Sequence, residues 1–351
     1  MHIWQLITLQ ALSHNPVIWF CCMVSKTGNY FPGLRNGLIP GVTVRIRVFL
    51  IVNALSQFFI LFTGNIVRVS KSGLGCPSWP ACSEKSLIAA PGYGIHGYIE
   101  FGNRLVALAV AVISLITLVA VWKLRKTHST IFYLTLLSAL GVPLQALIGG
   151  ISVLTKLNPY VVGLHTLVSI LLISDTCLAV FVTYTRRKID CYPAAYRFLS
   201  VFTILFACFV FVLGILTTGN LKHSGDPAAV RNSLTLAPLL HGVSAVILFF
   251  LVLTVFVFSM KAGFGTKRAS ACLLLLLFVQ IAIGLVQVHT NLPEYLVASH
   301  LMLAGLLAAA LTFFAQQYRS STSRKVPREA EKQHRLFQPI GRQAKDKYSI
   351  S

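Results

Sequence analysis

"QALIGGISVLTKLNPYVVGLH" (145–165) and "QIAIGLVQVHTNLPEYLVASH" (280–300) align with each other without a gap. Nine of the 21 positions are identical, among them Gln, Gly, Thr, Tyr and His. Apolar helices share Leu and Val through composition alone, whereas polar residues that agree in register indicate an internal repeat. The tripeptide "TGN" also occurs twice, at 63–65 and 218–220. These matches predict two structural units of the same orientation, the parallel kind of repeat.

The composition around these repeats is that of a membrane protein. The chain has 351 residues, of which 56% are hydrophobic and 11% charged, whereas soluble domains carry roughly 25% charged residues. Eight apolar stretches reach the roughly 20 residues that a helix needs to cross a bilayer. They are continuously apolar and do not alternate, which favours helices over a β-barrel. We expect them near 46–66, 101–122, 131–153, 160–183, 197–218, 238–259, 270–290 and 295–314.

The predicted fold is therefore an all-α polytopic membrane protein with eight transmembrane helices, arranged as two parallel-repeat four-helix bundles. Residues 46–188 form the first half and residues 189–318 the second half. Residues 1–45 are an uncertain N-terminal leader, which fits a ninth, poor helix, an interfacial segment or upstream sequence from a wrong start site. Residues 319–351 are polar and lack helical periodicity, so we expect a disordered basic cytoplasmic tail.

The formal charge of +21 is distributed as a topology signal. Sorted by the predicted loops, 23 of the 30 Lys and Arg residues fall on one side of the membrane and six on the other. Because basic residues concentrate on the cytoplasmic side, both ends of the helical core are predicted to be cytoplasmic. The first loop, with its cysteines, is then extracytoplasmic. The prediction is a multi-pass protein of the cell membrane, surrounded by lipid, with no nucleic-acid partner.

Three histidines lie near the predicted outer ends of helices, and two of them occupy corresponding places in the two halves. His165 and His300 end the two repeated segments, so they lie at equal depth near the outer ends of their helices. His241 follows Pro238, a residue favoured in the first turn of a helix. Two histidines on alternate helices of a bundle can coordinate one haem iron between them. Each could instead be a polar residue bonded to a neighbouring carbonyl, but the repeat favours the ligand interpretation for His241 and His300.

The stretch "IEFGNRL" (99–105) places polar side chains at the start of the second predicted helix. The repeat requires a partner for His165 there, and Asn103 occupies that position or lies close to it. Glu100 either pairs with Arg104, four residues on, or has a catalytic or proton-handling role. Arg104 either clamps a carboxylate of a haem or reaches to the membrane interface.

Cys76 and Cys82 lie together in the first outer loop, in "GCPSWPAC" (75–82). The outer side of a membrane is oxidising, so we expect a disulfide between them. A metal site is the rival interpretation. Apart from His96, however, no nearby Cys or His completes a tetrahedral set of ligands. Whether the pair is structural or exchanges with an incoming thiol stays open.

Several of these motifs resemble those of the haem A synthase family. The resemblance rests on "TGNIVRVSKSGLGCPSWPAC", "IEFGNRL", "LLHGVSAV" and the two repeated segments, and it covers roughly residues 50–315. It implies an eight-helix oxidoreductase that converts the C8 methyl of haem O to the formyl group of haem A, for terminal oxidase assembly. It also implies that His241 and His300 hold haem b. In the first half, it implies His165 as a ligand of the substrate haem and Glu100 as a catalytic residue.

One position departs from the family pattern. The first-half motif in much of the family reads Glu-Phe-x-His-Arg, whereas this chain has Asn103 in place of the histidine. Three explanations compete. The substrate haem is five-coordinate on His165, and Asn103 hydrogen-bonds a water or oxygen species at the iron; or His96, seven residues earlier, substitutes; or the half-site is inactive. The first is favoured because Glu100, Arg104, His165 and the cysteine loop are all present.

The resemblance also implies partners. A haem O synthase would supply the substrate and a haem A-containing oxidase would take the product, while the electron acceptor stays open, with a quinone as one candidate. Two other functions fit the histidines: a bis-His, cytochrome b-like electron carrier and a haem-transfer protein. Glu100 and the unequal halves favour the enzyme, because a carrier is expected to have two saturated bis-His sites. A haem-free transporter fits least, because its site would lie near the bilayer midplane.

Overall fold

The computed structural model describes residues 39, 41–82, 94–184, 192–220, 225–226 and 236–322. This part contains eight α-helices, all long and apolar enough to cross a membrane. They are α3 (Val44–Val69), α4 (Gly94–Val121), α5 (Ser129–Leu154), α6 (Pro159–Tyr184), α7 (Ala194–Asn220), α8 (Ala237–Lys261), α9 (Lys267–His289) and α10 (Glu294–Thr322), with the 3₁₀ helix η3 (Trp122–Arg125) after α4. The predicted all-α fold with eight transmembrane helices is confirmed. Most of the predicted leader and of the predicted tail lies outside the described residues.

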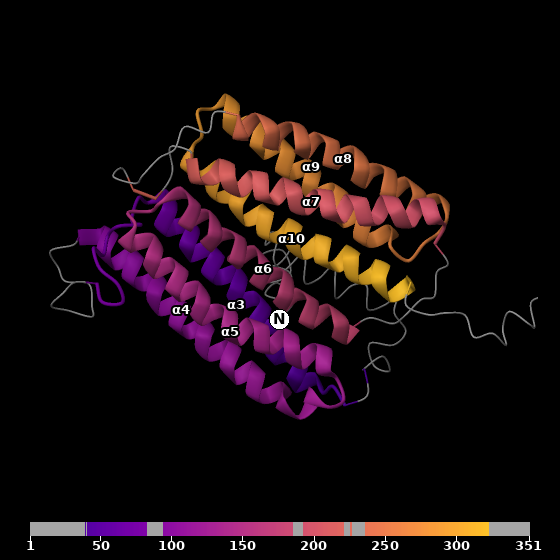
Figure 1. Ribbon diagram of the computed structural model, residues 1–351, viewed down its shortest axis with the longest axis horizontal. Helices are drawn as coiled ribbons and strands as arrows, with labels where there is room; N and C mark the ends of the chain where they lie inside the picture. Colours follow the sequence, from indigo (N-terminus) through magenta and orange to yellow (C-terminus); the bar gives the residue numbers. More distant parts are fainter. Residues whose placement is uncertain are drawn as a thin grey trace, which may run out of the picture.

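The helices form two neighbouring groups. Figure 1 shows α3–α6 as one group and α7–α10 beside it. In the first group each helix packs against the next and α6 returns to α3, so α4 and α6 lie diagonally opposite each other. In the second group α7, α8, α9 and α10 pack in sequence while α10 touches α7 only slightly, and α8 and α10 are the diagonal pair. The arrangement is consistent with the two predicted four-helix halves.

The two repeated segments have the same local backbone. Lys156 and Leu157, between α5 and α6, have φ angles of 52° and 56°. Asn291 and Leu292, between α9 and α10, have φ angles of 59° and 61°. Positive φ is uncommon for residues other than glycine, so its occurrence at aligned positions is specific. The turn that leads into each histidine-bearing helix is therefore built alike in both halves.

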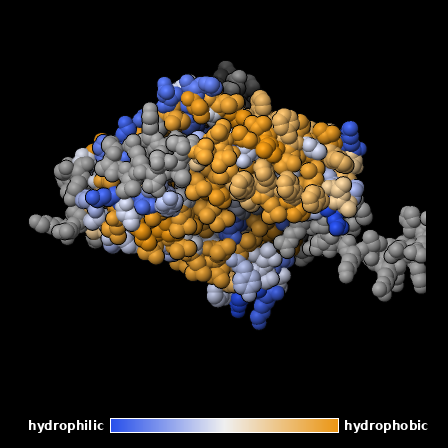
Figure 2. Space-filling view, turned by 45° about the horizontal axis from the view of Figure 1, so that its top comes forward, coloured by the Kyte–Doolittle hydropathy of each residue, from blue (hydrophilic) through white to orange (hydrophobic). Residues whose placement is uncertain are grey.

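The molecule is apolar outside and partly polar inside. Figure 2 shows hydrophobic residues spread over the helical face and hydrophilic residues gathered towards its edges. Inside the first group, Asn53 of α3 donates to Ser138 of α5 (3.1 Å) and accepts from Ser114 of α4 (2.8 Å). All three side chains are buried. Such satisfied polar contacts tie helices together where lipid supplies no hydrophobic driving force.

The two groups share a buried interface. α10 packs against α3 and α6 as well as α9, and α6 also packs against α7. One buried cluster contains Ile173 and Phe181 of α6 together with Ala54 of α3 and Ala309 of α10. Gly305 of α10 belongs to the same contact, because a Cβ there would lie 2.8 Å from Leu61. α10, the last of the described helices, thus completes the packing of the first group.

The start of α4 differs from the prediction. The helix begins at Gly94, seven residues before the predicted start at 101. Glu100 and Asn103 therefore lie in its second and third turns and not at its mouth. The long apolar run begins only after these residues, so hydropathy placed the boundary too late. The preceding loop covers the additional turns, since a Cβ on Gly75 would collide with the backbone carbonyl of His96.

Candidate functional site

The second-half histidines face each other across their bundle. His241 lies in the second turn of α8 and His300 in the second turn of α10, and their ring centroids are 6.4 Å apart. Imidazole nitrogens coordinate a metal at about 2.0 Å, so two rings on opposite sides of one iron fit this separation. His241 Nδ1 lies 3.2 Å from the carbonyl oxygen of Val210. That contact leaves Nε2 for a metal, as in most histidine ligands.

Each of the three predicted histidine ligands packs against a glycine of a neighbouring helix. A Cβ on Gly214 would lie 2.8 Å from Cε1 of His241, and one on Gly284 would lie 3.2 Å from Cε1 of His300. In the first half, a Cβ on Gly149 would lie 3.1 Å from Cε1 of His165. These glycines were not predicted as site residues. Gly149 and Gly284 are, however, the glycine that is identical in the two repeated segments. That identity could have predicted them.

A glutamine fixes the backbone of two of these histidines. Gln145 Nε2 donates to the carbonyl of His165 at 2.6 Å, and Gln280 Nε2 donates to the carbonyl of His300 at 3.1 Å. Gln145 also contacts Ser169. Both glutamines open the repeated segments, so the alignment contained this signal as well. The repeat therefore preserves a three-part unit of Gln, Gly and His between paired helices.

Asn103 is held by the helix beside it. Thr63 of the first "TGN" motif donates its hydroxyl to Oδ1 of Asn103 at 2.7 Å. The two "TGN" motifs are 155 residues apart (218 − 63). By the same offset, Gly214 corresponds to Phe59 (214 − 155), whose side chain is largely exposed. The first half thus has Asn in place of His and Phe in place of the glycine that faces it.

His96 does not lie beside Asn103. It is exposed, and its Nδ1 lies 2.9 Å from the hydroxyl of Ser72. The separation of seven positions between His96 and Asn103 places the two residues about 10 Å apart along α4. The structure therefore gives the substitution of His96 for the missing histidine no support.

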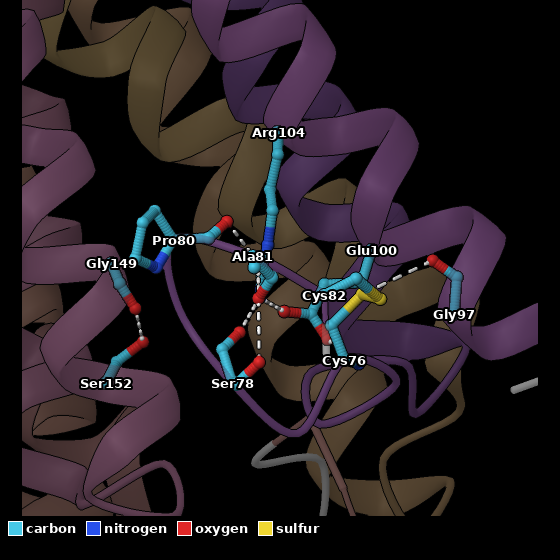
Figure 3. Close-up of polar contacts among 10 residues, drawn as sticks. All are labelled: Cys76, Ser78, Pro80, Ala81, Cys82, Gly97, Glu100, Arg104, Gly149 and Ser152. Carbon is cyan, nitrogen blue, oxygen red and sulfur yellow. Dashed lines mark hydrogen bonds and ion pairs between the residues drawn. A yellow bond between two sulfur atoms is a disulfide. The ribbon is translucent and has the colours of Figure 1, made fainter. Parts of the chain in front are cut away.

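Glu100 is buried and fastens the cysteine loop to α4. Its Oε2 accepts from the backbone N–H of Cys76 at 2.7 Å, and its Oε1 accepts from Nη2 of Arg104 at 2.6 Å (Figure 3). Only 5% of the Glu100 residue is exposed. The ion pair with Arg104, one of the two alternatives for Glu100, is present, and both carboxylate oxygens are used.

Arg104 extends the same attachment. Its guanidinium donates to the carbonyls of Ser78 (3.0 Å), Pro80 (3.2 Å) and Ala81 (3.2 Å), as Figure 3 shows. Its side chain is directed at the loop. Its predicted contact with a haem carboxylate stays a prediction, because these donors are directed at the loop.

The predicted disulfide is present. Cys76 and Cys82 are bonded, and both are fully buried. The loop that they close carries Trp79, whose ring packs so tightly on α5 that a Cβ on Gly150 would collide with it. Among the described residues, no group of three or more His, Cys, Asp or Glu side chains is placed to hold a metal ion. The disulfide therefore supersedes the metal interpretation of the cysteines.

Comparison with known proteins agrees with these features. The family model described as cytochrome oxidase assembly protein (COX15-CtaA) matches residues 47–223, half of the 351-residue chain. The chain belongs to this family. The match contains Glu100, Asn103, His165 and the cysteine loop. His241 and His300 lie beyond it and rest on the repeat and on their geometry.

Individual proteins similar to this chain match it over shorter stretches or at modest identity. A heme A synthase of Lysinibacillus sphaericus is 32% identical over 134 residues, which are 38% of this chain and 43% of that protein. A heme A synthase of Bacillus cereus is 24% identical over 187 residues, 53% of this chain and 58% of that protein. One of Geobacillus thermodenitrificans is 28% identical over 133 residues, 38% and 41% of the two chains. The matches thus span about two fifths to three fifths of these relatives.

The glycine beside His241 gives a test of the second-half site in this family member. Gly214→Ala is expected to displace the His241 ring, because the new Cβ would come within 2.8 Å of it. The haem content per polypeptide should fall several-fold, as measured by pyridine haemochrome absorption of the purified protein. Gly242→Ala is the matched control, since a Cβ there meets nothing within 4 Å. Equal haem contents in the two variants would contradict the assignment.

Proposed function

We propose that this protein is a haem A synthase, which oxidises the C8 methyl of haem O to the formyl group of haem A for terminal oxidase assembly. One observation carries the proposal: the two halves are built on the same Gln, Gly and His plan but differ at one ligand position. The second half has a facing pair of histidines, whereas the first half has His165 and Asn103. The paired histidines of the second half suit a haem that is retained. The single histidine of the first half suits a haem that undergoes reaction.

The second half is proposed to hold haem b as a cofactor. His241 and His300 would hold its iron, and Gly214 and Gly284 leave room for their rings. The bound haem would supply electron transfer to an acceptor, for which a quinone is one candidate. The contact of His241 with Val210 O orients that ring, and the bond from Gln280 to the His300 carbonyl fixes the other helix.

The first half is proposed to bind the substrate, haem O, through His165. The Thr63 hydroxyl donates to Oδ1 of Asn103. The Nδ2 group of Asn103 can therefore donate to a ligand. It would orient a small molecule, such as water, at the open side of the substrate. Of the three explanations for asparagine at position 103, we favour an open iron position on the substrate haem. The amide of Asn103 is held by Thr63, and Phe59 stands where the second half has a glycine.

Glu100 is the proposed catalytic acid or base. It is a buried carboxylate three residues before Asn103 on α4, and the cysteine loop covers it through Cys76. Carboxylates in such surroundings exchange protons in many enzymes. The loop, closed by its disulfide and held by Arg104, would exclude water from the same region. We place this loop on the extracytoplasmic side of the cell membrane, with both ends of the helical core in the cytoplasm.

The test is pigment analysis of the purified full chain. The protein is co-expressed with a haem O synthase. Its porphyrins are then extracted and identified by mass spectrometry. Haem A is the expected product, together with retained haem b. Haem b alone, in the presence of available haem O, would overturn the synthase proposal. A cytochrome b-like carrier would then be favoured, because the His241–His300 pair would still hold a haem.

Asn103 gives a second test. Asn103→His combined with Phe59→Gly installs in the first half the residue pair that the second half has at 241 and 214. A second imidazole would bind the iron of the substrate haem, so bound haem O should acquire a low-spin absorption spectrum. Conversion of haem O should continue, because histidine is the residue that the family motif has at this position. Phe59→Gly alone is the control, and an unchanged absorption spectrum in the double variant would contradict the proposed open position.

A further inference from the structure

A small cavity lies beside the proposed ligand His300, between the two halves. Its volume is about 30 Å³, and its walls include Arg68, Thr218, Gln287 and His300. A single water needs roughly 10–15 Å³ on this scale, so the space holds a group of about two water molecules, the size of a carboxylate. The cavity thus places a guanidinium next to a proposed haem ligand.

Arg68 comes from the other half of the molecule. It belongs to the last turn of α3, in the first half, and its Nη2 donates to the carbonyl of Thr218 on α7 at 2.5 Å. Two neighbours make similar connections. Lys71 lies 3.5 Å from the carboxylate of Glu294 on α10, and the N–H of Gly73 donates to the carbonyl of Gly225 at 2.9 Å. The outer end of α3 is therefore fixed against the second half.

Gln287 supplies an independent sign that the cavity takes a polar ligand. The residue is 8% exposed, and its Oε1 is buried without a hydrogen-bond partner. Buried polar atoms are nearly always paired, so an orphan at a cavity wall indicates a missing occupant. The oxygen and nitrogen of a glutamine amide exchange places when the amide turns over, so Gln287 can present its Nε2 donor to a carboxylate in the cavity. Together with a guanidinium, which matches carboxylates in a two-pronged fashion, it forms an anion site.

We propose that Arg68 binds a propionate of the haem held by His241 and His300, so that a residue of the first half completes the haem site of the second. The inference rests on the haem b site of the proposed function, and not on the oxidation of haem O. A haem has its carboxylates on one edge of the ring. Arg68 lies at the outer helix ends and lines the same carboxylate-sized cavity as His300.

The charge of Arg68 has a second consequence. A positive charge close to a haem stabilises the reduced form, which carries one charge less than the oxidised form, and a poorly solvated site strengthens the effect. Loss of the guanidinium should therefore shift the midpoint potential of the haem to lower values. Because Arg68 is fixed on α3, this electrostatic contribution comes from the half that binds the substrate.

The experiment uses the full chain produced without haem and then titrated with haem b or with haem b dimethyl ester, whose propionates are blocked. The variants are Arg68→Met, Arg68→Lys and the control Lys71→Met, which removes a more exposed charge three residues away. The wild type and Lys71→Met should bind haem b about tenfold or more tightly than the ester. Arg68→Met should bind both equally and have a lowered potential. Arg68→Lys should keep part of the preference.

The outcomes separate the alternatives. An unchanged preference for haem b over the ester in Arg68→Met would overturn the proposal, as would a wild type without that preference. If Arg68 instead serves the substrate haem of the first half, Arg68→Met would slow haem A formation without changing the potential of the bis-His haem. Failure of the chain to make haem A leaves the titration unaffected, so the two proposals fail separately.

Discussion

Replacing His300 with alanine is expected to remove the haem from the second half. His300 and His241 would share one iron, and their rings are 6.4 Å apart. Loss of one ring leaves a void next to Gly284, which cannot fill it, and a haem with a single ligand. The haem b content per polypeptide should fall by about tenfold or more, because an axial ligand is the main attachment of a haem. His241→Ala should have the same effect.

The measurement is pyridine haemochrome absorption relative to protein mass, on protein that elutes as a single species in detergent. His289→Ala is the matched control, since His289 is exposed at the end of α9 and takes no part in the proposed site. The assignment would be refuted if His300→Ala retained as much haem b as His289→Ala. Imidazole added to the His300→Ala protein should restore part of the haem binding, which a merely misfolded variant would not show.

The second large effect is expected for Glu100→Gln. The change keeps the shape of the side chain but removes its charge, so proton exchange is lost and Arg104 faces an amide. General acid–base groups contribute about 10² to 10⁴ to a rate. Conversion of haem O should accordingly fall by about 10² or more, with haem O or an alcohol intermediate accumulating. Haem b in the second half should stay at the wild-type level.

Arg104→Gln distinguishes chemistry from positioning. Arg104 binds Glu100 and three carbonyls of the loop, so its loss weakens the loop but keeps the carboxylate. A smaller loss of conversion than in Glu100→Gln is expected. Equal losses in both variants would show that Glu100 acts through the loop. The products are separated by reversed-phase chromatography and identified by mass, and free-thiol labelling verifies that Cys76 and Cys82 remain bonded.

The sequence predicted those features that depend on hydropathy and on the repeat. The membrane spans follow from long apolar runs, and the positions of His165 and His300 follow from an alignment in register. The disulfide was predicted from two cysteines in one short loop, and the structure contains it.

Features that depend on contacts between distant segments were not predicted. Gly214 lies outside the aligned segments, and its importance appears only when α7 packs against His241. The bond from Thr63 to Asn103 crosses 40 positions, and that from Arg68 to Thr218 crosses 150. The early start of α4 was missed for a related reason, because Glu100 is stabilised by a loop and not by its neighbours in sequence.

The cluster of Ala54, Ile173, Phe181 and Ala309 bears on how the protein is assembled. Membrane proteins enter the bilayer during synthesis, from the N-terminal end onward. α10 packs against both α3 and α6, and it follows all the other described helices in the chain. Four inserted helices would therefore leave the first half with an uncovered face, even with all of its own residues in place. The first half should therefore reach its packed form only after α10 has been inserted.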